Sequence, residues 1–141
     1  MSNLLEKHIT KQVRDYLAAR GWRPVRMHPV VTPGMFSAGE PGQPDYLFLH
    51  YRGRAALVLW IEFKGPKDRR RCVCRGGDKN LCAVCRQQAW HDRERLRGAT
   101  VWVVSDIAEF IAEYERVYGW LHFGDAARGQ LDLLADAGEK T

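Results

Sequence analysis

Two acidic residues and a lysine stand at the ends of two apolar segments of the chain. Asp45 opens the first segment, at 45–51, and Glu62 and Lys64 close the second, at 55–64. Side chains alternate between faces along a strand, so Glu62 and Lys64 point the same way if the second segment is a strand. Two carboxylates and an ammonium at the ends of paired strands are the groups that metal-assisted hydrolysis of a phosphodiester requires.

The two segments predict a β-hairpin, because residues 52–54, Arg-Gly-Arg, place a glycine between two apolar runs. The second run is almost continuously apolar, which predicts a central strand covered on both faces. Residues 100–104 predict another short strand, and residues 23–31 an edge strand limited by two prolines. Paired strands of this kind would bring the acids to one end of a sheet.

Helices are predicted on either side of these strands. Apolar residues at helical spacing, or apolar runs that begin at a cap, predict helices at about 3–20, 85–97 and 106–118. Gly21 and Gly98 are the predicted stops of the first two helices. The resulting order is helix, two or three antiparallel strands, helix, strand, helix. That order predicts an α/β fold in which helices flank a mixed sheet.

Composition sets the class of protein and of partner. A chain of 141 residues predicts one domain, and a net charge of +5 favours a polyanionic partner. The start lacks the long apolar core of a signal peptide, and no apolar run is long enough to cross a bilayer. We therefore expect a cytoplasmic protein that does not bind membranes.

Four cysteines gather in the basic stretch 65–86, which we interpret as an insert. They form a C-x-C pair and a C-x-x-C pair, which together suit tetrahedral Zn²⁺ in a structural site. Free thiols or disulfides are the alternatives, and His91 is a weaker substitute ligand. The expected zinc ligands are Cys72, Cys74, Cys82 and Cys85. The expected nucleic-acid contacts of the insert are Lys67, Arg69, Arg70, Arg71, Arg75 and Lys79.

The short patterns fit together as a family signature. Pro44-Asp45 followed by Glu62-x-Lys64 resembles the PD-(D/E)XK superfamily of nucleases. Gly-Gln before Pro44, an acid at Glu6 on the first helix, and a glutamine three residues before Trp90 are similar to the VRR-NUC family within it. The resemblance covers about residues 5–106. It implies a restriction-endonuclease-like αβββαβ core, from which the cysteine insert departs.

The resemblance also implies a catalytic site that binds Mg²⁺ or Mn²⁺. Asp45 and Glu62 would be the main ligands, with the backbone carbonyl of Phe63 as a further one and Glu6 binding directly or through water. Lys64 would orient the attacking water and neutralise charge on the phosphate. The implied catalytic residues are Glu6, Asp45, Glu62, Lys64 and Gln87.

Each of these residues also has a simpler interpretation. Asp45 could cap a turn, Glu62 and Lys64 could form only a salt bridge, and Glu6 could be a solvated helix residue. The active-site glutamine is Gln87 by its spacing to the following tryptophan, with its neighbour Gln88 as the alternative. The positions of the side chains in the folded protein would distinguish these simpler roles from the catalytic ones.

The function expected from the resemblance is DNA endonuclease activity. Small nucleases of this kind act on branched DNA such as Holliday junctions as homodimers, and one site per chain would need a second copy to cut two strands. Two alternatives stay open. One is a zinc-stabilised nucleic-acid-binding module without catalysis, and the other is a nuclease that acts on RNA or on a sequence-specific duplex.

Overall fold

A computed structural model describes residues 2–27, 40, 42–65, 71–74 and 82–123. The chain divides into two compact units, Met1–Asp106 and Ile107–Thr141, and each is treated by itself below. The prediction of a single nuclease domain over the whole chain stays a prediction. Part of the expected basic insert lies outside the described residues, namely Lys67, Arg69, Arg70, Arg75 and Lys79.

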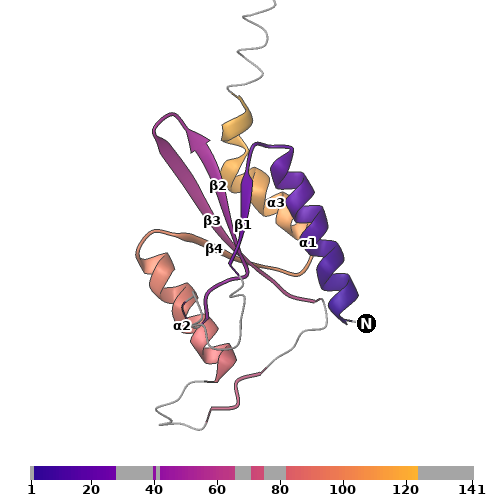
Figure 1. Cartoon of the computed structure of the whole chain (residues 1–141), viewed down its shortest axis with the longest axis vertical. Coiled ribbons are helices and arrows are strands. Elements are labelled where there is room, and N and C mark those ends of the chain that lie inside the picture. Colours follow the sequence, from indigo (N-terminus) through magenta and orange to yellow (C-terminus); the bar gives the residue numbers. More distant parts are fainter. Residues whose placement is uncertain (1, 28–39, 41, 66–70, 75–81, 124–141) are drawn as a thin grey trace, which may run out of the picture. The chain divides into compact units, whose positions relative to one another are not determined.

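The first unit contains a mixed four-stranded sheet (Figure 1). Its strands are β1 (Arg23–Arg26), β2 (Tyr46–Arg52), β3 (Ala55–Phe63) and β4 (Thr100–Val104), in the spatial order β1-β2-β3-β4. The pairs β1–β2 and β2–β3 are antiparallel, and β4 runs parallel to β3. The sequence prediction of a hairpin, an edge strand and a further strand is therefore confirmed.

The hairpin between β2 and β3 decides where the acidic residues lie. Gly53 turns the chain with a φ of 59°, a conformation that glycine adopts without strain. Tyr46, the first residue of β2, pairs with Ile61 near the end of β3. Asp45 directly precedes that pair and Glu62 directly follows it. The register thus brings both carboxylates to the same end of the sheet.

Strand β3 forms the centre of the sheet, as its apolar sequence predicts. It lies between β2 and β4, and Leu59, Ile61 and Phe63 are almost fully buried. Glu62 is also buried, with 5% of its surface exposed, although its side chain is charged. A charged group at such a position needs a partner, because burial without one costs free energy.

Helices α1 (Ser2–Ala18) and α2 (Ala83–Leu96) pack on the sheet. Arg14 of α1 lies over the ring of Tyr46, whereas Trp90 of α2 meets the ring of Trp60 edge to face at 5.0 Å. Tyr46 pairs with Ile61, the neighbour of Trp60, so these two contacts are on opposite faces. The two helices therefore cover opposite faces of the sheet.

Both helices end as the sequence predicts. Gly21 and Gly98 follow α1 and α2 with φ of 83° and 91°. In α1, Ile9, Val13 and Leu17 form the buried face, at the expected helical spacing. An α/β fold with a mixed sheet flanked by helices is therefore confirmed, and its site-bearing elements all lie in the first unit.

The second unit contains helix α3 (Ile107–Tyr118). The rings of Phe110 and Tyr114 lie 6.0 Å apart, and those of Tyr114 and Tyr118 lie 5.6 Å apart, which places three aromatic side chains on one helix face. Among the described residues, no helix has the length and apolar content that crossing a bilayer requires.

Candidate active site and metal centre

A pocket of about 580 Å³ opens at the end of the sheet where Asp45 and Glu62 meet. Five residues implied by the sequence resemblance line it, and they come from two helices and from two strand ends. They are Glu6, Asp45, Glu62, Lys64 and Gln87. Residues separated by up to 81 positions in the chain thus share one cavity, whose volume lies in the usual range for binding sites.

Glu62 and Lys64 lie on the same face of β3, as the alternation of side chains predicts. The ammonium Nζ of Lys64 donates to Oε1 of Glu62 at 2.6 Å. Both side chains are largely buried, with 18% of the lysine and 6% of the glutamate exposed. The backbone N–H of Lys64 also donates to the carbonyl of Val104, at 2.9 Å, so the lysine is held against β4. The salt bridge of the simpler interpretation is therefore present.

The salt bridge leaves half of the carboxylate without a partner. Among the residues that the structure describes, no group donates to the buried Oε2 of Glu62. A buried carboxylate oxygen normally accepts a hydrogen bond or binds a cation, because losing its water without replacement costs free energy. The salt-bridge interpretation accounts for one oxygen of Glu62, and the second fits a cation ligand.

Glu6 and Asp45 face the same pocket from other directions. Asp45 is half-buried, and its carbonyl accepts from the N–H of Met27 at 2.9 Å, which joins it to the end of β1. Glu6 is half-buried near the start of α1 and borders this pocket as well as a neighbouring one. The three carboxylates around this cavity are hard oxygen donors of the kind that a divalent cation prefers.

The loop before Asp45 packs directly on helix α2, and a glycine makes this possible. Gly42 has a φ of 89°. A Cβ atom there would lie 2.4 Å from the carbonyl oxygen of Arg86 and 2.9 Å from the Cα of Gln87. Only glycine permits this approach, so Gly42 sets the spacing between Asp45 on one wall of the pocket and Gln87 on the other.

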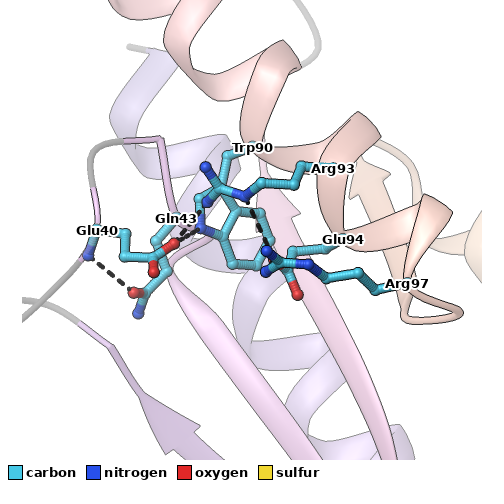
Figure 2. A network of polar contacts seen from close by, with 6 residues as sticks. All are labelled: Glu40, Gln43, Trp90, Arg93, Glu94 and Arg97. Atoms are coloured by element: carbon cyan, nitrogen blue, oxygen red, sulfur yellow. Dashed lines mark hydrogen bonds and ion pairs between the residues drawn. The ribbon is translucent and has the colours of Figure 1, made fainter.

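A polar network fastens the same loop to α2 (Figure 2). One carboxylate oxygen of Glu40 accepts from the indole Nε1 of Trp90 at 2.8 Å and from Nη2 of Arg93 at 2.6 Å. The backbone N–H of Glu40 donates to Oε1 of Gln43 at 3.2 Å. Glu94 continues the network through Arg93 and Arg97. The loop is therefore held by charge and hydrogen bonds before any ligand binds.

The two candidate glutamines on α2 differ in their surroundings, although both line the pocket. Gln87 is half-buried. Gln88 is exposed, and its amide Nε2 donates to Asp92 at 2.8 Å on the outside of the helix. Trp90 is buried and packs in the core. The half-buried position of Gln87, beside an exposed Gln88, favours it as the glutamine that faces a ligand.

Sequence reasoning missed two further residues of the pocket wall. Gln43 and His91 line the pocket, and each has a buried nitrogen, Nε2 in both cases, without a hydrogen-bond partner among the described residues. Burial lowers the pKa of His91, and the positive charge of Arg95 lowers it further, so the imidazole is neutral. His91 thus belongs to this pocket and is not part of the cysteine cluster.

The unpartnered buried atoms concentrate in this one pocket. The described residues contain four such side-chain atoms, and three of them belong to pocket residues: Gln43, Glu62 and His91. The fourth belongs to His50, which contacts Trp22. Polar groups that lack partners are rare inside folded proteins, so their concentration here makes this pocket the candidate ligand site among the described residues.

The four cysteines form a second, separate cluster. The sulfur atoms of Cys72, Cys74, Cys82 and Cys85 all lie within 4.8 Å of one another. A tetrahedral zinc with bonds of about 2.3 Å separates its sulfur ligands by about 3.8 Å, so small shifts would fit the ion. The cluster could hold a metal ion, as the cysteine spacing predicts. Cys82 and Cys85 sit at the start of α2, the helix that carries Gln87.

The surroundings of the thiols favour a cation at their centre. Backbone N–H groups of Cys85 and Val73 lower the pKa of Cys82 to about 6, which makes it a thiolate at neutral pH. The Sγ atoms of Cys72 and Cys85 lie 3.0 Å apart, and this contact raises the pKa of Cys85 above its usual value. Four thiolates cannot gather without positive charge, so a metal would replace the protons they otherwise keep.

The expected basic contacts of the insert are described at one position only. Arg71 is exposed beside the cysteine cluster, and the other five lie outside the described residues.

Comparisons of the chain with protein-family models, with curated proteins and with solved structures find no significant match. The function of the site therefore has to be argued from its own geometry and chemistry.

Proposed function

We propose that this chain is a Mg²⁺- or Mn²⁺-dependent endonuclease that hydrolyses phosphodiester bonds of DNA. The observation that carries the proposal is the shared pocket of Asp45, Glu62 and Lys64, in which the buried Oε2 of Glu62 has no donor among the described residues. The element order of helix, three strands, helix and strand is the one expected for the PD-(D/E)XK nuclease core, to which the proposal assigns the fold.

The residues present fit a hard divalent cation. Asp45 and Glu62 supply carboxylate oxygens, and Glu6 supplies a third from α1. When bound, such a cation polarises the phosphate and lowers the pKa of a coordinated water. The backbone carbonyl of Phe63, another lining residue, stays a predicted ligand.

The protein groups around the cation would bind and orient the substrate. Lys64 carries its ammonium at a rigid strand end in the site. There the ammonium would stabilise the negative charge that develops on the phosphate. To do so it must divide its three donors between Glu62 and the phosphate, which an ammonium can do. Gln87 offers an amide donor and an acceptor from the facing helix, suited to orienting a water molecule.

The four cysteines would hold a structural zinc. All four ligands come from cysteine, so a zinc there would have no open position for chemistry. The segment that carries Cys72 and Cys74 is exposed and belongs to no helix or strand, so it has little apolar burial to hold it. Zinc would tie this segment to the start of α2, and so to the helix wall of the catalytic pocket.

The decisive experiment is cleavage of labelled junction, flap and duplex DNA in Mg²⁺ or Mn²⁺. We expect Glu62→Gln and Asp45→Asn to lower the rate about 10³-fold, because a metal ligand contributes several kcal/mol of charge stabilisation. Glu113→Gln is the matched control, since that glutamate pairs with Arg116 on α3 and lines neither described pocket.

The outcomes separate the candidate functions. Full activity of Glu62→Gln would refute the proposed site. Tight DNA binding by the wild-type protein without cleavage in either metal would instead assign the fold to a non-catalytic binding module. Faster cleavage of junctions than of duplex, by a species with the mass of two chains, would support the expected homodimer on branched DNA. Preferential cleavage of RNA would replace DNA as the substrate.

A further inference from the structure

A second pocket, of about 320 Å³, adjoins the candidate active site along helix α1. It shares three lining residues with the first pocket: Glu6, Asp45 and Phe63. Away from these shared residues the second pocket is basic, because four cationic side chains line it. They are Lys7, Lys11, Arg14 and Arg26, and we name them the α1 groove cations. The same acids thus stand between a catalytic pocket and a basic one.

The spacing of the cations places them in a row. Lys7, Lys11 and Arg14 are four and three positions apart, which sets them one above another on a single face of α1. The opposite face of the helix carries the buried residues Ile9 and Val13. The cationic row therefore follows the helix axis and leads toward Glu6 at the border of the active site.

Arg26 supplies the other wall of the groove. It lies at the end of β1 and pairs directly with Tyr46, the residue after Asp45. Arg14, on α1, lies over the same tyrosine, with its guanidinium 5.6 Å from the centre of the Tyr46 ring. Stacking on an aromatic ring restricts an arginine while leaving its N–H groups free to bind phosphate. Arg14 and Arg26 therefore both lie next to Tyr46, which directly follows the candidate metal ligand Asp45.

Little neutralises this positive charge. Among the residues that the structure describes, Lys7 and Arg26 form no ion pair. Lys11 pairs with Asp15, but both side chains are more than 60% exposed, so the pair is weak and can exchange for another anion. A row of exposed cations, of which Lys11 alone has an ion pair among the described residues, lies next to a candidate phosphodiesterase site and suits an extended polyanion.

We propose that the α1 groove binds the backbone phosphates of the DNA strand on one side of the bond that is cut. This inference rests on the proposed function for the identity of the strand. With the scissile phosphate at Asp45 and Glu62, the next phosphates of that strand lie along the α1 groove cations. The contacts are to phosphate oxygens, so the groove sets the position of the strand without reading its sequence.

The test measures DNA binding separately from cleavage. Fluorescence anisotropy follows a labelled 20-nucleotide single strand and the matching duplex, without added divalent metal, over a series of salt concentrations. The protein is the full chain carrying Glu62→Gln, so that no cleavage disturbs the measurement. The groove variant adds Lys7→Gln and Arg26→Gln. The matched control adds Arg23→Gln and Arg54→Gln, which removes the same charge from exposed positions outside both pockets.

We expect the groove variant to bind DNA at least tenfold more weakly in about 0.1 M salt. The slope of log K against log salt should become shallower by about 2, one unit for each lost phosphate contact. The control should retain the affinity and slope of the parent within a factor of about two. In the otherwise wild-type enzyme, the groove substitutions should raise KM and leave kcat near its original value.

Three results would overturn the groove proposal, and two of them concern the variants. One is an unchanged salt slope for the groove variant. The other is an equal loss of DNA affinity in the groove and control variants, which would mean that binding depends only on the net charge of the protein. Failure of the proposed function gives a different pattern, in which DNA binds through the groove but the wild-type protein cuts no nucleic acid. Absence of any DNA binding by the parent also rejects the groove.

Discussion

The two candidate cation sites of this protein are supported in opposite ways. The acidic pocket is formed by the end of a four-stranded sheet and by two helices, and Glu62 lies on the most buried strand. The cysteine cluster joins an exposed segment, residues 71–74, to the first turn of α2. Backbone hydrogen bonds and apolar burial hold the first site before metal binds, whereas the second has mainly its own ligands.

This contrast also separates the chemistry of the two sites. The pocket presents carboxylate oxygens, which suit Mg²⁺ or Mn²⁺, and it remains open to a substrate. The cluster presents four sulfur atoms, which suit zinc and leave no open position. We infer that the pocket would survive loss of its metal with little change in shape, and that the cluster would not.

Removing two of the cysteine thiols tests most strongly whether the two sites are held independently. We expect Cys82→Ser with Cys85→Ser to reduce zinc from about one ion per chain to near zero, because two of four ligands are lost. Amide hydrogen exchange should accelerate at the start of α2 and stay slow in β3. Elemental analysis and exchange mass spectrometry measure both, and Val73→Ser, between two of the cysteines and 79% exposed, is the control. Fast exchange throughout β3 would show that the two sites are one unit.

The pH dependence of zinc binding tests whether the cysteines bind the metal as thiolates. Cys85 has a raised pKa and must release a proton to bind metal, whereas Cys82, with a pKa of about 6, is already a thiolate at pH 7. Zinc affinity should therefore rise with pH, with fewer than four protons released per ion at pH 7. Below pH 6 the number should increase, since Cys82 is then protonated as well. Calorimetry in buffers of different ionisation enthalpy counts the protons, and pH-independent affinity would contradict a thiolate site.

A glycine substitution tests whether the pocket depends on packing and not on metal. Gly42→Ala adds a methyl group at a φ of 89°, with the carbonyl oxygen of Arg86 only 2.4 Å from the new Cβ. Gly98→Ala is the matched control, because its φ of 91° imposes similar strain with no atom nearby.

We expect Gly42→Ala to lose about 2 kcal/mol of unfolding free energy and Gly98→Ala about 1 kcal/mol, since only the first adds a clash to the backbone strain. Urea denaturation measures both values. DNA cleavage should fall only in Gly42→Ala, because only there does the loop before Asp45 move away from Gln87. Equal effects of the two substitutions would mean that the close approach at Gly42 does not position the pocket.

Much of this arrangement is predictable from local sequence. The hairpin around Gly53, the helix stops at Gly21 and Gly98, and the central strand with Glu62 follow from turn chemistry and apolar patterning. The prediction that Glu62 and Lys64 share a face follows from strand geometry alone. In each case the decisive interactions join residues that are close in the chain.

The remaining features depend on contacts across long separations. Glu40 meets Trp90 50 positions away, and this contact places the loop that brings Gln43 into the pocket. His91 enters the pocket because Trp90 packs on Trp60 and so fixes the rotation of α2. The sequence places Gln43 in a Gly-Gln-Pro-Asp motif and offers His91 only as a weaker zinc ligand, but their positions in the pocket arise only when helix and sheet pack together.

The amino-acid sequence therefore specifies which chemical groups the protein carries and which ends of its strands bear them. Turn residues and apolar periodicity act over a few positions, so they specify elements and the faces of elements. That Gln43 and His91 join the expected residues in one cavity, and that a basic groove on α1 borders it, follows only from the folded chain. Those neighbours are set by how helices pack on the two faces of the sheet, and such packing depends on contacts between segments that are distant in the chain.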